Sequence, residues 1–293
     1  MMSTLQDFLS CSDPNVRNVL LGTILLSTSS AMIGVLALLK RKTLISDAIA
    51  HAVLPGSCLA FLLTGNKNSI WLIISAFITG WLASIAIDQI TTHSKIKLDA
   101  AIAIVASIAF GLGSFLLSML QHNGQAGQGG LKSFLLGSAA TLLQEDVVAL
   151  LWLSGIIIVV LILFFKEFML IAFDRLFAQS IGLPIKKINF LFTSLMVLAI
   201  VIGIRAVGVV LMSAMLITPS TTARFWTGKI AYIMLFAMLI AVFASLVGTF
   251  ISYTIPSMPT GPWIVVIMSL IAYSSFLVAW CGRIFKKKRI NIS

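Results

Sequence analysis

The chain has 293 residues, of which 59% are hydrophobic and only 10% are charged, and its mean hydropathy is +1.09. This composition excludes an ordinary soluble domain and indicates an integral membrane protein. Apolar runs of about 20 residues take up nearly the whole length. We therefore expect an all-α fold with one polytopic domain over residues 17–282, an extracytoplasmic segment over 1–16 and a basic cytoplasmic tail over 283–293.

The apolar runs predict nine membrane-spanning helices. With the N-terminus outside, 16 of the 20 Lys and Arg residues fall in inner connections or the C-terminal tail, a strong positive-inside bias that places the C-terminus inside. The formal charge of +11 is then explained by anchoring at the lipid surface, and no nucleic-acid partner is expected. The nine expected spans are 17–40, 45–64, 69–90, 98–120, 146–166, 188–204, 205–223, 229–254 and 260–282.

One further apolar segment, residues 131–143, is too short to cross a hydrocarbon core of about 30 Å comfortably. If it did cross, the basic stretch that follows would lie outside. We therefore expect it to be re-entrant or to lie on the outer surface.

The stretch "SDAIAHAVLPG", residues 46–56, places polar groups in the second expected span. Asp47 and His51 are four residues apart, so a helix presents them on one face. Carboxylate and imidazole together suit a first-row divalent metal ion, and a carboxylate inside a membrane is costly unless it faces a wet cavity or the protein interior. Pro55 and Gly56 follow, and the proline frees a backbone carbonyl and allows a kink.

Two structural explanations of this pair stay open. Asp47 and His51 could bond to each other or to a neighbouring helix and fix packing. Alternatively, Asp47 could lie near the inner headgroups, because Lys40, Arg41 and Lys42 come only a few residues before it.

The inner connection "KEFMLIAFDRLFAQSIGLPIKK" is too polar to span the membrane. Phe173, Leu176 and Phe177 recur at helical spacing, and Gly182 with Pro184 supplies a stop, which predicts an amphipathic helix over about 172–184. Such a helix either lies on the lipid headgroups or docks into a groove of another protein.

Three isolated polar or helix-breaking positions are weaker candidates. Asp99 begins a span, where the helix dipole stabilises an acid, so capping explains it better than metal binding does. Arg205 is expected at the outer end of a tight helical hairpin, with a gate-side ion pair as the alternative. Pro219 lies in the polar run Thr218–Thr222, whose hydroxyls can satisfy the backbone groups that a proline frees.

Several stretches, taken in order, resemble one family: the membrane subunits of ATP-binding-cassette importers for manganese, zinc or iron. The matching stretches are "SDAIAHAVLPG", "IKLDAAIAIVASIAFGLG", "FDRLFAQSIGLP", "RAVGVVLMSAMLITPSTTAR" and "MPTGPWIVV", spread over about residues 17–282. The resemblance implies the fold of the cobalamin-importer (type II) class and a bacterial cytoplasmic membrane. The family often has an acidic residue just before the aspartate that corresponds to Asp99, and this chain has Leu98 there, which weakens a paired-carboxylate role.

The resemblance also implies partners: a second permease, identical or different, cytoplasmic ATPases, and an extracytoplasmic metal-binding protein. The predicted inner helix would be the coupling helix, with Phe173, Asp174, Leu176, Phe177, Ala178 and Gly182 in it. Asp47 and His51 would hold the transported ion transiently, and no cofactor would be bound permanently.

The sequence also limits the chemistry. It has no G-x-x-x-x-G-K-[ST] phosphate loop, so any ATP-driven work must come from a partner, and the chain is not expected to be an enzyme. Two other functions stay open: a secondary transporter that uses Asp47 and His51 as a proton relay, and a structural or assembly protein without a substrate.

Overall fold

A computed structural model describes residues 14–64, 69–122, 144–255 and 260–290, without the side chains at 69, 121, 122, 205, 210 and 282–290. Every regular element in these ranges is a helix, which confirms the all-α prediction. The helices are α2 (Pro14–Leu39), α3 (Ile45–Thr64), α4 (Ser69–His93), α5 (Leu98–His122), α7 (Gln144–Leu163), α8 (Phe165–Phe173), α9 (Arg175–Ser180), α10 (Ile185–Val207), α11 (Val209–Trp226), α12 (Ile230–Thr254) and α13 (Thr260–Ile290).

Eight of the described helices are long and apolar enough to cross a membrane: α2, α3, α4, α5, α7, α10, α12 and α13. The remaining expected span, 205–223, corresponds to α11, which is shorter, with 18 residues, and contains Pro219 in its interior. Its hydroxyl-rich run lowers its hydropathy, so it is the one expected span that length and composition do not identify in the structure. The nine-helix expectation therefore agrees roughly with the described residues.

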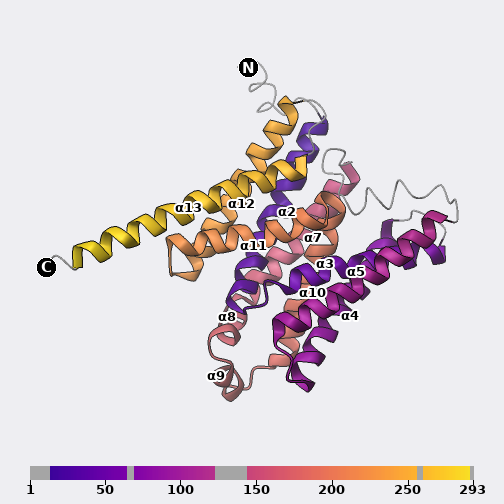
Figure 1. The fold of residues 1–293 in the computed structure, drawn as a ribbon, viewed down its shortest axis with the longest axis horizontal. Helices are drawn as coiled ribbons and strands as arrows, with labels where there is room; N and C mark the ends of the chain where they lie inside the picture. The colour runs from indigo at the N-terminus through magenta and orange to yellow at the C-terminus, as the bar shows by residue number, and fades with distance from the viewer. Residues whose placement is uncertain (1–13, 65–68, 123–143, 256–259, 291–293) are drawn as a thin grey trace.

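The two most buried helices, α2 and α3, form the centre of the molecule. Helices α4 and α5 pack on α3, and α7, α11 and α12 pack on α2. Figure 1 shows the resulting arrangement, with α3, α4 and α5 on one side, α11, α12 and α13 on the other, and α13 projecting away from the rest. This placement leaves one face of α3 uncovered in the single chain, and that face carries the polar pair.

Close approach of the central helices depends on glycine. A Cβ atom at Gly34 of α2 would collide with the carbonyl oxygen of Leu216 in α11, and one at Gly56 of α3 would lie 2.8 Å from the carbonyl oxygen of Ser75 in α4. Small residues at such contacts let helix backbones pack directly against each other, as membrane helices commonly do.

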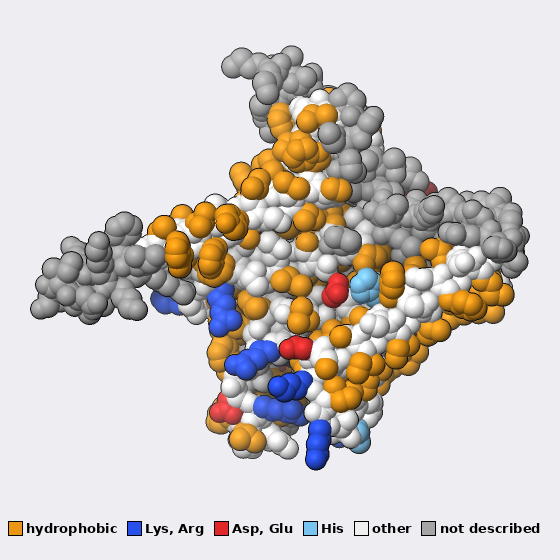
Figure 2. Space-filling view, in the orientation of Figure 1, with side chains coloured by type: hydrophobic (Ala, Val, Ile, Leu, Met, Phe, Trp, Pro, Cys, Tyr) orange, Lys and Arg blue, Asp and Glu red, His pale blue; other side chains and the backbone are white. Residues whose placement is uncertain are grey.

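Charged residues gather toward one end of the molecule. In Figure 2, Lys and Arg side chains lie over the lower part of the face, toward the end where Figure 1 places α8 and α9, while the upper part is hydrophobic. This distribution is what the positive-inside interpretation predicts for a cytoplasmic end.

The structure corrects several predicted boundaries. The inner helix expected over about 172–184 is shorter: α9 covers Arg175–Ser180, and a separate helix, α8, precedes it. The chain breaks at Asp174, whose φ of −139° and ψ of 90° are extended rather than helical. The predicted segment 131–143 lies outside the described residues.

The boundary expected between the sixth and seventh spans, at residues 204 and 205, is also wrong. The break falls at Gly208, where φ is +90°, a conformation that glycine adopts readily, and not at Arg205. Helix α11 then packs mainly against α2, α12 and α13 instead of lying along α10, so the tight hairpin expected there is wrong.

Candidate functional site

Asp47 and His51 lie in the first two turns of α3, on the same face. The Asp47 Oδ2 and His51 Nε2 atoms are 3.8 Å apart, and the side chains are 51% and 33% exposed. That distance is too long for a good hydrogen bond. Because two metal–ligand bonds of about 2.0–2.2 Å together exceed 3.8 Å, one ion can contact both atoms.

The exposure of the pair contrasts with its surroundings. From Ile45 to Cys58, all residues of α3 except Asp47 and His51 are buried. The pair keeps this exposure although the His51 ring meets Phe110 of α5, so packing against a neighbouring helix does not by itself account for the pair. The pair is instead presented on the open face of α3.

Pro55 lies within α3, and the helix continues through it. In an α-helix the N–H of residue 55 would bond to the carbonyl of residue 51, and proline has no N–H. The carbonyl oxygen left without its usual donor is therefore that of His51 itself. This oxygen is a possible third ligand, besides the Asp47 carboxylate and the His51 imidazole.

His51 also borders a cavity. Its ring meets the ring of Phe110 from α5 edge to face, with centroids 5.4 Å apart and an interplanar angle of 78°. The cavity, of about 610 Å³, is bounded by α3, α5, the junction of α10 and α11, and the start of α13. Among the described residues that line it, His51 alone is ionisable; the others are Ala50, Leu54, Phe110, Val207, Gly208, Val209, Leu211, Pro262, Val265 and Val266.

One copy of the described chain does not complete a metal site by side chains alone. Among the described residues, no three His, Cys, Asp or Glu side chains lie close enough to hold an ion. Asp99 is exposed in the first turn of α5, eleven residues before Phe110, which is roughly 16 Å along the helix axis. The structure therefore brings Asp47 and His51 together and leaves Asp99 apart from them.

The segment α8–α9 presents an apolar ridge. The side chains of Phe173, Leu176, Phe177 and Ile181 are all more than half exposed, whereas Ala178 is buried. Asp174 caps α9, because its Oδ1 accepts a hydrogen bond of 2.8 Å from the backbone N–H of Phe177. Such exposed aromatic and aliphatic side chains, next to basic residues, suit a groove on a partner protein.

Gly182 ends α9 with φ of +80°. The N–H of Leu183 donates to the carbonyl of Ala178, and the N–H of Gly182 donates to that of Gln179. This is the Schellman pattern, in which glycine is preferred because it tolerates the left-handed conformation.

Two other predicted positions are helix-internal. Arg205 lies in the last turn of α10, and its side chain is outside the described part of the chain. Pro219 lies within α11, where the hydroxyls of Ser220, Thr221 and Thr222 donate to the carbonyls of residues 216–218. The carbonyl that Pro219 frees is that of residue 215. These three hydroxyls donate to the carbonyls that follow it and not to the freed one.

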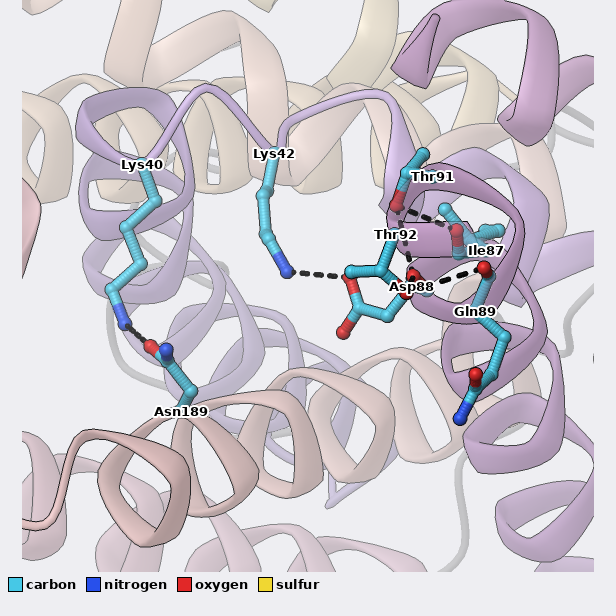
Figure 3. Close-up of polar contacts among 8 residues, drawn as sticks. All are labelled: Lys40, Lys42, Ile87, Asp88, Gln89, Thr91, Thr92 and Asn189. Atoms are coloured by element: carbon cyan, nitrogen blue, oxygen red, sulfur yellow. Dashed lines mark hydrogen bonds and ion pairs between the residues drawn. The ribbon is translucent and has the colours of Figure 1, made fainter. Parts of the chain in front are cut away.

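Sequence reasoning missed a polar cluster at the inner end, drawn in Figure 3. Lys40 Nζ donates to Asn189 Oδ1 of α10 at 2.9 Å, and Lys42 Nζ pairs with Asp88 Oδ1 of α4 at 3.0 Å. The run Lys40–Lys42 looked like an ordinary anchor of the kind that positive-inside counting expects. Its partners lie too far along the sequence for any local pattern to identify them.

Comparison with known proteins identifies the family. Residues 12–279 match the family described as the ABC 3 transport family. The chain belongs to the ABC 3 transport family.

Two similar proteins are named as membrane proteins of metal transport systems. The chain is 42% identical over 93% of its length to the manganese transport system membrane protein MntC of Bacillus subtilis, and the match spans 62% of that longer relative. It is 38% identical to the zinc transport system membrane protein TroC of Treponema pallidum, over 91% of this chain and 90% of that one.

A solved structure shares the fold. PsaBC from Streptococcus pneumoniae, determined in complex with Fab, aligns with a TM-score of 0.83 at 30% identity, over 98% of this chain and 100% of that chain. The resemblance found from sequence motifs is therefore confirmed: this is a multi-pass membrane permease subunit of the ABC 3 family, whose members serve manganese, zinc and iron transport systems.

Proposed function

We propose that this chain imports a divalent transition-metal ion, manganese, zinc or iron, and that Asp47 and His51 hold the ion on its path. The observation that carries the proposal is the exposed carboxylate–imidazole pair on a helix that is otherwise buried. A membrane protein has little reason to leave such a pair open unless an ion or a partner reaches it.

Two chains would complete the site. Each contributes one carboxylate and one imidazole, so a pair of permeases facing each other across α3 supplies four side-chain ligands. A site divided between two subunits comes apart when they move, which suits transient binding. Tight coordination by one chain would oppose release.

Partner proteins supply the energy and the ion. ATP-binding subunits bind the ridge of α8–α9, and an extracytoplasmic metal-binding protein delivers the ion to the opposite side. ATP binding and hydrolysis then shift the subunits between outward-open and inward-open states. In this arrangement the N-terminus is outside and the C-terminus inside a bacterial cytoplasmic membrane.

A proton-driven secondary transporter is the competing function. The ridge of Phe173, Leu176 and Phe177 favours the ATP-driven one, because a secondary carrier needs no exposed apolar docking surface at its cytoplasmic end. A protonophore separates the two: uptake that persists when the proton gradient is dissipated and ATP is supplied is ATP-driven.

The direct test is uptake of radiolabelled manganese, zinc and iron into vesicles that contain the chain with its ATP-binding and metal-binding partners. Removal of a metal ligand or its support commonly costs about 10- to 100-fold, so Asp47→Asn and His51→Gln should each lower uptake of one metal by at least tenfold at unchanged ATPase content. Glu145→Gln, which removes an exposed carboxylate in the first turn of α7, is the matched control. Wild-type uptake in the Asp47 and His51 variants would contradict the proposal.

A further inference from the structure

The connection between α2 and α3 makes polar side-chain contacts with two neighbouring helices, α10 and α4. Lys40 bonds to Asn189 of α10, and Lys42 pairs with Asp88 of α4, so two neighbouring helices hold one short loop (Figure 3). The Lys42–Asp88 pair is exposed at 29% and 50%, and pairs of that kind contribute little energy. The Lys40 ammonium, in contrast, is largely buried.

The Lys40 ammonium lies in an aromatic box. Its Nζ atom is 4.3 Å from the centre of the Phe192 ring and 5.2 Å from that of Phe168, and these rings meet edge to face with centroids 5.7 Å apart. Both rings are almost fully buried. Burial lowers the pKa of Lys40 to about 8, and the charge of Lys42 acts in the same direction. Cation–π contacts and the Asn189 bond offset part of that desolvation cost.

The box joins three helices. Lys40 follows the last residue of α2, Phe192 and Asn189 belong to α10, and Phe168 belongs to α8. Helix α8 leads through Asp174 directly into α9, where the N–H of Ala178 donates to the Asp174 carbonyl at 3.0 Å. A displacement of the exposed α9 ridge therefore reaches Phe168, and with it the lysine, through consecutive hydrogen-bonded turns.

On its other side, Lys40 is tied to the candidate metal pair. The N–H of Lys42 donates to the Ala37 carbonyl, that of Ile45 to Lys42, and that of Asp47 to Leu44, all at 2.8–3.2 Å. Only six residues separate Lys40 from Asp47, and these hydrogen bonds hold the connection between them in a compact turn. Arg41 adopts φ of +55°, a costly conformation for a non-glycine residue, so the turn is held against some strain.

We propose that Lys40 is a positioning residue which links α8–α9 to α3, so that movement of the cytoplasmic segment shifts Asp47 and His51. This inference rests on the proposed function. Lys40 does not contact the ion; it acts through the backbone that carries Asp47.

The alternative is that Lys40 merely fills space beneath the rings. Replacing a buried charge by an apolar side chain of similar length is often neutral or stabilising, so Lys40→Met should fold under either explanation. A packing role predicts that this variant also transports normally. A linking role predicts that the variant folds but no longer couples ATP hydrolysis to metal transport.

The experiment measures metal ions transported per ATP hydrolysed by the complete complex in vesicles. Couplings between two sites usually amount to about 5- to 150-fold, so we expect Lys40→Met to lower this ratio at least fivefold while ATP hydrolysis continues. Lys40→Arg, which keeps the cation over the rings, should restore most of the ratio. Lys186→Met, at an exposed lysine one turn before Asn189, is the control and should leave it unchanged.

A second readout keeps the inference separate from the proposed function. Hydrogen exchange at residues 42–51 should change on ATP binding in the wild type and not in Lys40→Met. If the wild type transports no metal, the proposed function fails. The difference in hydrogen exchange between wild type and Lys40→Met still tests whether Lys40 links α8–α9 to α3. A wild-type transport ratio or a wild-type exchange response in Lys40→Met would overturn the inference.

Discussion

The imidazole of His51 and the ring of Phe110 meet edge to face, with centroids 5.4 Å apart. Phe110 comes from α5, so the contact holds His51 of α3 against α5, and both side chains line the cavity. A ligand that is already oriented loses less freedom when it binds an ion, which gives Phe110 a supporting role in metal binding.

Phe110→Ala should weaken metal binding. Aromatic pairs contribute about 0.5–1.5 kcal/mol beyond their burial, which corresponds to a change in Kd of about 2- to 12-fold. Equilibrium dialysis of the purified chain with manganese or zinc would measure the shift. Phe115→Ala removes another exposed phenylalanine from α5 and serves as the control; an equal loss in both variants would contradict a specific role for Phe110.

Gly34→Ala should destabilise the fold strongly. The added methyl group would meet the backbone carbonyl of Leu216, which cannot rotate away, so α2 and α11 must separate. Overpacking of this kind typically costs about 1–3 kcal/mol or more. Gly155→Ala, in α7, meets nothing within 4 Å and should be neutral or stabilising by up to about 1 kcal/mol. Thermal unfolding in detergent tests the contrast, and a similar Tm for the two variants would refute it.

Docking of the ATP-binding subunit should depend on the ends of α9. This helix has only six residues and relies on its caps. Asp174→Ala removes the N-cap bond, at a cost of about 1 kcal/mol, and Gly182→Ala forces alanine into the left-handed region, at about 1–2 kcal/mol. Both should reduce recovery of the ATP-binding subunit in a pull-down, while Asp174→Asn retains the cap and should recover it. Full recovery with both damaging variants would show that docking does not need an ordered α9.

Stability should depend on pH through Lys40. Its pKa is about 8 in the folded protein against 10.5 for the free side chain, so between these values the unfolded chain holds more protons and stability rises with pH. The stability gained when Lys40 loses its proton is fully present above pH 10.5 and is lost as the pH falls through about 8. Methionine does not titrate, so the Tm of the wild type minus that of Lys40→Met should increase from pH 7 to pH 10. A constant difference would contradict the lowered pKa.

That subtraction is needed because other ionisable residues lie on the helices around Lys40. They include Arg41 and Lys42 on the same loop, Asp88 on α4, Lys166 and Glu167 on α8, and Lys186 and Lys187 on α10. Each is present in both proteins, so its own titration cancels in the difference to first order.

Sequence patterns predicted the parts of the structure that local rules control. The membrane requires long apolar helices, so most spans followed from composition, and helical spacing alone placed Asp47 and His51 on one face. Helix α11 was harder to delimit, because Gly208 sets its start through a positive φ that nothing in the apolar pattern around Arg205 indicates.

Long-range contacts were not predictable. Lys40 meets Asn189 across 149 residues of sequence, and the aromatic box forms only when α8 and α10 pack against the end of α2. From the sequence, Lys40 is one of several inner charges. In the same way, Asp174 was expected within one helix, whereas its side chain caps α9 and its backbone ends α8.

Binding of the transported ion by Asp47 and His51 is tested by X-ray absorption of manganese or zinc bound to the purified chain. The chain has only three histidines, so imidazole scattering has few possible sources. We expect an imidazole signal that disappears in His51→Gln and persists in His93→Gln, with affinity lowered about tenfold or more in Asp47→Asn. A signal that survives in His51→Gln would place the ion elsewhere and contradict binding by Asp47 and His51.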